Sequence, residues 1–276
     1  MVSALASYLD ARANHGIWLL RIEDIDPPRE ADGASELIVT ALAAHGLNWD
    51  GSILWQSARR EIHDRALNSL LRNGDAFCCD CSRRDLEHLG ARYSGKCRDR
   101  TDLGRDGDCA IRLNTDTESV TFVDLIQGRK QYALAELGGD FVIRRRDRLI
   151  AYQLATAFDD SLDGITTVVR GNDLIDSTPR QILVQKKLGL RVPQYAHIPV
   201  LVNGDDQKLS KQTHAPAIDS NAAPANLLLA LKLLGQHQPR AEQACDCATI
   251  LDWAVRHWRL DQVPRRAILP APPGHC

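Results

Sequence analysis

Residues 165–202 read ITTVVRGNDLIDSTPRQILVQKKLGLRVPQYAHIPVLV. The runs 165–169 and 198–202 are short and apolar and predict strands, whereas residues 179–188 between them have the apolar spacing of a helix. Both predicted strands are apolar at consecutive positions, which is typical of strands that are buried on two faces. The order strand, helix, strand therefore predicts a parallel α/β sheet.

Strands and helices alternate over most of the remaining chain. Further strands are expected at 17–22, 110–113, 120–126 and 141–143. Helices are expected at 2–13, 37–45, 62–70 and 150–158, and again towards the C-terminus at 227–234 and 250–258. The predicted fold class is therefore α/β, with a helical C-terminal part.

The composition is that of an ordinary globular protein. The 276 residues are 44% hydrophobic and 25% charged, with a net charge of −2, so the bulk charge does not indicate a nucleic-acid binder. No apolar run approaches the roughly 18 residues of a membrane span, and the N-terminus has no signal-peptide pattern. Eight cysteines without a secretory signal favour a reducing, cytoplasmic compartment and argue against a disulfide framework.

Apolar periodicity fades between residues 77 and 108, where Cys, Arg, Asp and Gly dominate. This segment is expected to be an insert that is stabilised by something other than a hydrophobic core. Cys79 and Cys81 are two residues apart, and Cys97 can close a site from the far side of a short loop, which suits tetrahedral Zn²⁺. The candidates for a fourth ligand are Cys78, His88 and Tyr93, and general ligand chemistry favours His88.

A polar loop follows the predicted strand at 198–202 and contains KLSKQ at 208–212. Lysine carries a compact charge on a flexible stem, so it can follow the negative charge that develops during phosphoryl or nucleotidyl transfer. We therefore expect Lys208 and Lys211 to neutralise phosphates.

Three blocks of sequence resemble the catalytic domain of glutamyl-tRNA synthetases in order and in spacing. They are RIEDIDPPR at 21–29, VRGND at 169–173 followed by STPRQ at 177–181, and KLSKQ at 208–212, which corresponds to the family's KMSKS loop. The resemblance covers nearly the whole chain and is closest to the short glutamyl-Q tRNA(Asp) synthetases, which lack an anticodon-binding domain. The length agrees with these, because only 65 residues follow Lys211.

The resemblance implies a Rossmann-like class I synthetase catalytic domain with a small zinc-binding insert and a helical C-terminal part. The expected divisions are 1–76 and 109–202 for the catalytic domain, 77–108 for the zinc-binding insert, and 203–276 for the KMSKS-type loop and the helical C-terminal region. The implied enzyme activates L-glutamate with ATP and Mg²⁺, then transfers it to queuosine at the wobble position of tRNA(Asp). A monomer without membrane contacts is expected.

The resemblance also implies roles for individual residues. Lys211 would contact the ATP phosphates, with Lys208 assisting, and Glu23 would hold the α-amino group of glutamate. Tyr152 and Arg170 would close on the substrate, since arginine suits a bidentate grip on a carboxylate. Without the resemblance, Tyr152 would be interpreted as a core tyrosine and Arg170 as a surface arginine.

In the insert, the resemblance selects one of the candidate ligands. The short synthetases have a Cys-x-Cys…Tyr-x-x-x-Cys module, which this chain matches with Cys79, Cys81, Tyr93 and Cys97. The family pattern therefore implies that Tyr93, rather than His88, is the fourth zinc ligand.

The chain departs from the family at its start. The family begins with a strand and turn of the form R-F-A-P-S-P-T-G and a HIGH-type motif, whereas this sequence begins at Met1, inside the expected first helix. The first strand of a doubly wound sheet usually has neighbours on both sides, so its absence would leave the backbone groups of two strands unpaired. We therefore expect the chain as written to be inactive and poorly stable. The alternative function is a truncated, catalytically inactive tRNA-binding protein.

Overall fold

The computed structural model describes residues 1–82, 84–85, 93–100, 109–203, 207–208, 218–240, 244 and 246–271. The helices in these ranges are α1 (Val2–Ala13), α2 (Ala34–Ala44), α3 (Arg60–Arg72), α5 (Tyr152–Leu162), α6 (Thr178–Lys187), α7 (Ala223–Leu233) and α8 (Cys247–His257). The strands are β1 (Arg21–Ile22), β2 (Leu54–Trp55), β3 (Ala76–Cys79), β4 (Ala110–Leu113), β5 (Ser119–Asp124), β6 (Gly128–Ala133), β7 (Val142–Arg144), β8 (Thr167–Gly171), β9 (Gln194–Ile198), β10 (Val200–Val202) and β11 (Ile268–Pro270).

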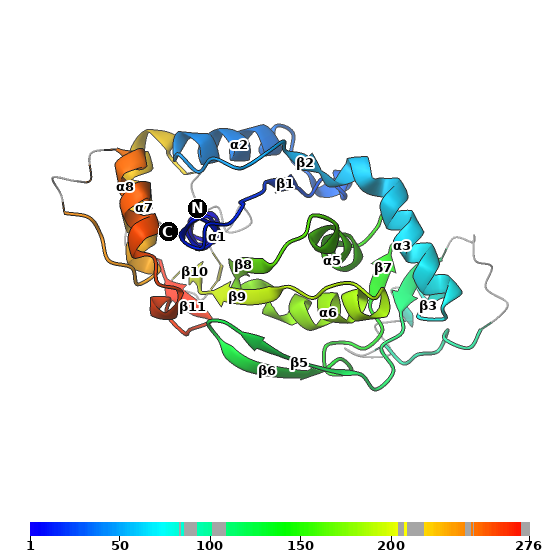
Figure 1. The fold of residues 1–276 in the computed structure, drawn as a ribbon. Helices are drawn as coiled ribbons and strands as arrows, with labels where there is room; N and C mark the ends of the chain where they lie inside the picture. The colour runs from blue at the N-terminus through cyan, green and yellow to red at the C-terminus, as the bar shows by residue number, and fades with distance from the viewer. Residues whose placement is uncertain are drawn as a thin grey trace.

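A four-stranded sheet in the order β6-β5-β9-β8 forms the centre of the fold (Figure 1). β9 runs parallel to both β8 and β5, with Arg170 opposite His197 and Asp124 opposite Tyr195. The predicted α/β class is confirmed, because β8, α6 and β9 follow one another as strand, helix and strand. A wholly parallel sheet is a wrong expectation, because β6 pairs antiparallel to β5. β6 reads GRKQYA, so its polar residues gave no apolar pattern.

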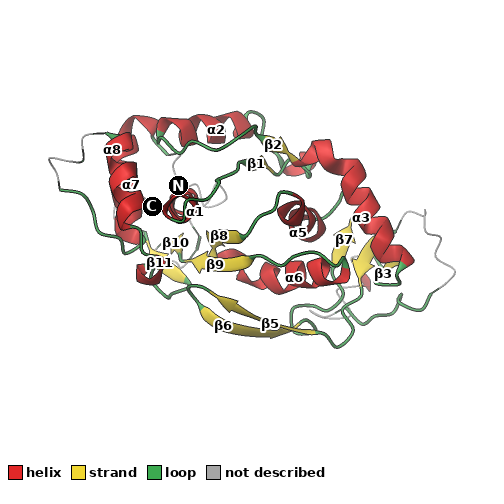
Figure 2. Ribbon diagram, in the orientation of Figure 1, coloured by secondary structure: helices red, strands yellow, loops and turns green. Residues whose placement is uncertain are grey.

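Two apolar cores hold the elements together. The first joins α3, α5 and α6 to the strands and includes Ile111, Leu154 and Leu183, which are 0–2% exposed. The second joins α1 to α7 and α8 and includes Leu5 and Leu231. α7 and α8 lie at one end of the molecule and α3 with β3 at the other, while β5 and β6 form one border of the view (Figure 2). The predicted C-terminal helices are therefore present as α7 and α8.

The segment 17–22 is less regular than its apolar sequence predicted. Only Arg21 and Ile22 pair as a strand, with Leu54 and Trp55 of β2, and Ile17 is 74% exposed. The backbone N–H of Trp18 donates to a carboxylate oxygen of Asp50 rather than to a strand partner. The predicted buried strand is therefore wrong over its first four residues.

β8 is the last strand of the central sheet, so one of its edges has no strand partner among the described residues. A pocket of about 1200 Å³ lies beside this edge and is lined by β8, by α1 and by the segment around Trp18. Val168 and Val169 of β8 and Ile17 and Leu19 of the segment contribute apolar walls.

A buried ionic network joins β1, α3 and α5. Asp159 accepts hydrogen bonds from Gln56 at 2.8 Å and from His63 at 2.9 Å, and it forms a 3.3 Å ion pair with Arg59. Arg59 also pairs with Asp163 at 2.6 Å. The carboxylate of Asp159 is fully buried, and these partners offset the free-energy cost of burying its negative charge.

In the described part of the chain, no helix is long and apolar enough to cross a membrane.

Candidate active site and metal centre

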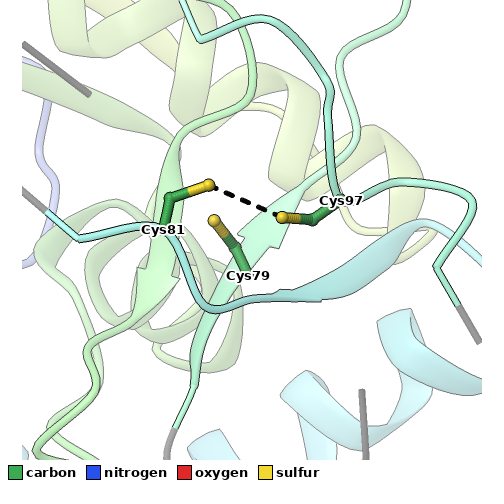
Figure 3. A group of neighbouring side chains, drawn as sticks. All are labelled: Cys79, Cys81 and Cys97. Atoms are coloured by element: carbon green, nitrogen blue, oxygen red, sulfur yellow. Dashed lines mark hydrogen bonds between the residues drawn. The ribbon is translucent and has the colours of Figure 1, made fainter. Parts of the chain in front are cut away.

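Three cysteine side chains converge at the end of β3. Cys79 is the last residue of this strand, Cys81 follows two residues later, and Cys97 comes from a distant part of the insert. Their sulfur atoms all lie within 4.8 Å of one another, and the sulfurs of Cys81 and Cys97 are 3.6 Å apart (Figure 3). The structure therefore brings together three predicted ligands, which could hold one metal ion.

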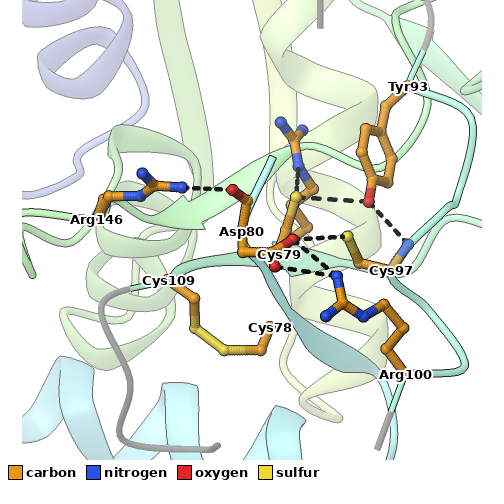
Figure 4. Close-up of a disulfide and its surroundings, with 9 residues drawn as sticks. Cys78, Cys79, Asp80, Tyr93, Cys97, Arg100, Cys109 and Arg146 are labelled. Carbon is orange, nitrogen blue, oxygen red and sulfur yellow. Dashed lines mark hydrogen bonds and ion pairs between the residues drawn. A yellow bond between two sulfur atoms is a disulfide. The ribbon is translucent and has the colours of Figure 1, made fainter. Parts of the chain in front are cut away.

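The Tyr93 hydroxyl lies at the same cluster. Its oxygen is 3.4 Å from the sulfur of Cys79 and accepts a 3.1 Å hydrogen bond from the backbone N–H of Cys97 (Figure 4). Of the other two candidates for the fourth ligand, Cys78 forms a disulfide bond, and His88 lies outside the described residues.

Arg112 provides positive charge beside the cluster. Its Nε is 3.3 Å from the sulfur of Cys79, and its guanidinium carbon is 4.2 Å from the centre of the Tyr93 ring. Burial raises the pKa of Cys79, but the hydrogen bonds with Tyr93 and Arg112 outweigh it and leave this pKa below its ordinary value. Burial and the neighbouring sulfurs raise the pKa of Cys81 to about 12. Adjacent thiolates repel one another, and a bound cation relieves that repulsion.

Cys78 forms a disulfide bond with Cys109 beside the metal cluster (Figure 4). The cysteine content argued against a disulfide framework and this pair was not predicted, but the described residues include this one disulfide. Cys78 lies in β3, Cys109 directly precedes β4, and the antiparallel pairing of these strands leaves their Cα atoms 5.8 Å apart. This distance is within the range that a disulfide requires. No local pattern indicates this contact, because the two cysteines are 31 positions apart in the chain.

The residues predicted to bind the substrate meet at the start of α5. The hydroxyl of Tyr152 accepts a 3.3 Å hydrogen bond from Nη1 of Arg170 on β8. Thr156, one helical turn after Tyr152, donates a 3.2 Å hydrogen bond to Oε1 of Glu23, which follows β1. Residues four apart lie on one face of a helix. One face of α5 therefore contacts both Glu23 and Arg170.

Glu23 lies in a site that favours a positively charged ligand. Its side chain keeps 40% of its surface exposed, but the surrounding protein excludes enough water to raise its pKa above the ordinary value. Arg21 opposes this shift only partly, because it lies 3.5 Å from Glu23 and makes its shorter contact, 2.7 Å, with Asp160. An ammonium group next to Glu23 would stabilise the ionised carboxylate.

Arg170 is 8% exposed and is held from several sides. Its Nε donates to Nε2 of His197 at 3.1 Å, and its Nη2 donates to the hydroxyl of Thr178 at 2.7 Å. Its guanidinium carbon lies 5.3 Å from the centre of the Tyr195 ring. Among the described residues, Arg170 forms no ion pair with a carboxylate. Asp160 attracts the charge of Arg170 electrostatically without forming an ion pair with it, so an anionic ligand in direct contact would further stabilise this buried guanidinium.

The two predicted phosphate-binding lysines differ in what the structure describes. Lys208 pairs with Asp173 at 2.5 Å, and Asp173 lies just beyond β8, at the end of the strand that carries Arg170. Lys211 lies outside the described residues.

Thr156 and His197 contact the predicted residues but were not singled out from the sequence. Thr156 could have been found, because it follows Tyr152 by four positions and carries a hydroxyl on the same helical face. His197 gave no signal, since a single histidine in an apolar strand is usually a structural residue.

A family model described as tRNA synthetases class I (E and Q), catalytic domain, matches residues 2–250. The chain belongs to this family. It is therefore a ligase-type enzyme of the class I synthetases, and its α/β fold agrees with that membership.

Curated relatives of this class I synthetase share nearly its whole length. The glutamyl-Q tRNA(Asp) synthetase of Serratia proteamaculans is 46% identical over 266 residues, which are 96% of this chain and 87% of the relative. The protein of the same description from Pseudomonas aeruginosa PAO1 is 45% identical over 270 residues, which are 98% of this chain and 92% of the relative.

Solved structures share the fold of this class I synthetase at lower identity. A glutamate tRNA ligase from Elizabethkingia meningosepticum has a TM-score of 0.77 at 21% identity, over 96% of this chain and 62% of that one. A glutamate-tRNA synthetase from Elizabethkingia anophelis has a TM-score of 0.79 at 21% identity, over 99% of this chain and 64% of that one. The chain thus spans less than two thirds of either structure.

Proposed function

We propose that this class I synthetase activates L-glutamate with ATP and transfers the glutamate to queuosine at the wobble position of tRNA(Asp). The observation that carries the proposal is that a positively charged and a negatively charged side chain both contact one face of α5. Arg170 is buried without a carboxylate ion-pair partner among the described residues, while Glu23, which contacts the same face of α5 through Thr156, favours a cation. An amino acid with a second carboxylate presents these charges together. The names of the relatives support glutamate and tRNA(Asp) as substrates.

The proposed reaction has two steps. The α-carboxylate of glutamate attacks the α-phosphate of ATP, the bond between the α-phosphorus and the bridging oxygen of the β-phosphate breaks, and pyrophosphate leaves. Mg²⁺ bound to ATP would share in neutralising the phosphate charge. A queuosine hydroxyl then attacks the carbonyl of glutamyl-adenylate, and AMP leaves. In this proposal Glu23 binds the α-amino group, and Arg170 and Tyr152 bind carboxylate oxygens. Lys211, assisted by Lys208, would stabilise the charge that develops on the phosphates.

The proposal is tested by glutamate-dependent ATP–pyrophosphate exchange, followed by attachment of radiolabelled glutamate to tRNA(Asp). Both are measured in the 276-residue chain and in a version that carries the family's R-F-A-P-S and HIGH-type motifs before Met1. We expect glutamate-dependent exchange, together with labelling of tRNA(Asp) that contains queuosine at the wobble position but not of tRNA(Asp) that contains guanosine at that position. Binding of tRNA(Asp) without exchange in both versions would instead favour the inactive tRNA-binding protein.

In the version that carries the family's N-terminal motifs, Lys211→Ala is expected to lower glutamate-dependent pyrophosphate exchange by roughly 10²-fold or more, the scale of losing one charge partner of the transition state. The matched control is Lys186→Ala, which removes an exposed lysine from α6 and should leave the exchange rate unchanged. Full exchange activity in Lys211→Ala would show that this lysine has no phosphate role.

We further propose that the cluster of Cys79, Cys81, Tyr93 and Cys97 holds structural Zn²⁺. At a Zn–S distance of about 2.3 Å, a tetrahedral site separates its sulfurs by about 3.8 Å. The 3.6 Å between Cys81 and Cys97 and the 3.4 Å between the Cys79 sulfur and the Tyr93 oxygen are close to this spacing. A centre with three thiolates and Zn²⁺ carries one negative charge, which Arg112 can balance.

Elemental analysis is expected to find about one zinc ion per chain, and Cys81→Ser should lower that content because it removes one of four ligands. Cys247→Ser is the matched control, since Cys247 is a free cysteine at the start of α8, outside the cluster. Tyr93→Phe should weaken zinc retention and His88→Ala should not. Unchanged zinc content in Cys81→Ser would rule out the assigned site.

A further inference from the structure

A row of buried polar side chains crosses three neighbouring strands beneath the predicted substrate site. Asp124 ends β5, His197 lies in β9 and Arg170 lies in β8, and these strands are adjacent in the central sheet. Asp124 and His197 are 2% and 0% exposed. The proposed reaction uses Arg170 but neither of the other two residues.

The hydrogen-bond directions in this row are fixed by the Arg170 end. A guanidinium can only donate, so Nε2 of His197 must accept the 3.1 Å hydrogen bond from Nε of Arg170. The ring proton is then on Nδ1, which donates to Oδ2 of Asp124 at 2.5 Å. The hydroxyl of Thr178 lies 3.0 Å from Nε2 of His197 and accepts from Nη2 of Arg170, so it supports the same arrangement.

Asp124 is itself held rigidly by the backbone. Its Oδ1 accepts hydrogen bonds from the backbone N–H groups of Ile126, Gln127 and His197, at 2.8–3.1 Å. Burial raises the pKa of Asp124, but the hydrogen bonds from His197 and the backbone outweigh it, so this pKa lies below its ordinary value. The row therefore starts from an ionised carboxylate in a fixed position.

We propose that His197, oriented by Asp124, is a positioning residue for the glutamate site: it fixes the Nε edge of Arg170 so that the Nη1 edge faces Tyr152 and the substrate carboxylate. This inference rests on the proposed function. An arginine side chain loses substantial rotamer entropy when it is ordered. If the guanidinium is already held in place before the ligand binds, binding does not require this further loss of side-chain entropy, and the affinity for the carboxylate is higher.

Two substitutions of nearly equal size separate the two ends of His197. In His197→Asn, the amide nitrogen occupies the place of Nδ1 and can still donate to Asp124, but no atom reaches Arg170. In His197→Gln, the amide oxygen occupies the place of Nε2 and can accept from Arg170, whereas the contact with Asp124 is lost. We expect His197→Asn to weaken L-glutamate binding by about 10-fold, the effect of losing one hydrogen bond to a charged group, and His197→Gln by less than about 3-fold.

The readouts are the Kd for L-glutamate, the Kd for ATP and the midpoint of urea unfolding, each measured for both variants. If His197 positions Arg170, the Kd for glutamate should rise in His197→Asn and the Kd for ATP should stay unchanged. In an Arg170→Ala background, His197→Asn should add no more than about a 2-fold further loss, because residues that act through one contact are not additive.

Several results would overturn the proposal. Equal losses of glutamate affinity in the two His197 variants, in proportion to their loss of stability, would show a merely structural role. A full 10-fold loss from His197→Asn in the Arg170→Ala background would show that His197 does not act through Arg170. If Arg170→Ala weakens glutamate binding and His197→Asn does not, the inference fails and the proposed function stands. If Arg170→Ala leaves glutamate binding unchanged, both fail.

Discussion

Arg170→Ala is expected to lower kcat/KM for glutamate in the pyrophosphate exchange reaction by roughly 10²-fold or more. The N–H of Nη1 that does not donate to Tyr152 can donate to the substrate carboxylate. Such a charge-assisted hydrogen bond contributes about 1.5–3 kcal/mol, the attraction of the buried charge adds to it, and a factor of ten corresponds to about 1.4 kcal/mol. The side chain is buried, so water cannot replace the lost bonds easily. KM for ATP should change little, because the lysine loop rather than Arg170 is proposed to bind the phosphates.

Arg170→Lys is the informative companion of this variant. It keeps the positive charge but loses the planar fork that donates to Tyr152, His197 and Thr178 at once. We expect Arg170→Lys to recover only part of the lost activity. A KM for glutamate that is unchanged in both variants would remove Arg170 from the proposed site, whereas equal rises in KM for glutamate and ATP would indicate general damage to the fold.

Asp159→Ala is expected to lower the free energy of unfolding by about 3–5 kcal/mol, the usual cost of removing one partner from a buried ion pair. The carboxylate is fully buried, and its loss leaves His63 and Gln56 without their acceptor and removes one of the two carboxylates that pair with Arg59. For a chain of this size such a change corresponds to a fall in Tm of roughly 6–20 °C. Asp64→Ala is the control, because Asp64 lies on the exposed face of α3 and should change stability by less than about 0.5 kcal/mol.

The effect of Asp159 should depend on pH. Burial raises the pKa of Asp159, but the interactions with His63 and Gln56 outweigh it, so the folded-state pKa lies below the ordinary value of 3.8. A depressed carboxylate pKa contributes stability above the unfolded value, and this contribution is lost as the pH falls towards the folded value. The stability gap between the wild type and Asp159→Asn should therefore be widest near neutral pH and narrow below pH 3.8. A gap of constant size, measured by urea unfolding, would contradict this linkage.

The sequence was sufficient for those parts of the fold whose signal is local. Residues 165–169 predicted β8 and residues 179–188 predicted α6, because apolar periodicity reports directly on burial. The strand predicted at 198–202 corresponds to β10, and β9, at Gln194–Ile198, was missed except for its last residue. β6 escaped prediction because its strand is polar, and 17–22 misled because its apolar residues line a pocket instead of joining a sheet.

The site shows the same division between local and distant information. The resemblance to the family identified Glu23, Tyr152 and Arg170. Only the fold shows that α5 brings these residues together, because Thr156 contacts Glu23 and Tyr152 contacts Arg170. Asp124 and His197 are 73 positions apart, and no local pattern connects them. Cys78 and Cys109 present the same difficulty, since their contact depends on the register of two strands.

The unpartnered edge of β8 has a practical consequence for work in solution. Among the described residues no strand pairs with this edge. A strand edge without a partner strand is a template on which another chain can add a strand, and Val168 and Val169 provide the apolar, β-branched side chains that favour such growth. Heating exposes more strands at the same time. We therefore expect heated samples to aggregate at a rate that rises with protein concentration, so that apparent melting temperatures shift with the scan rate. Reversible denaturation in urea at low protein concentration is the sounder basis for comparing variants of this chain.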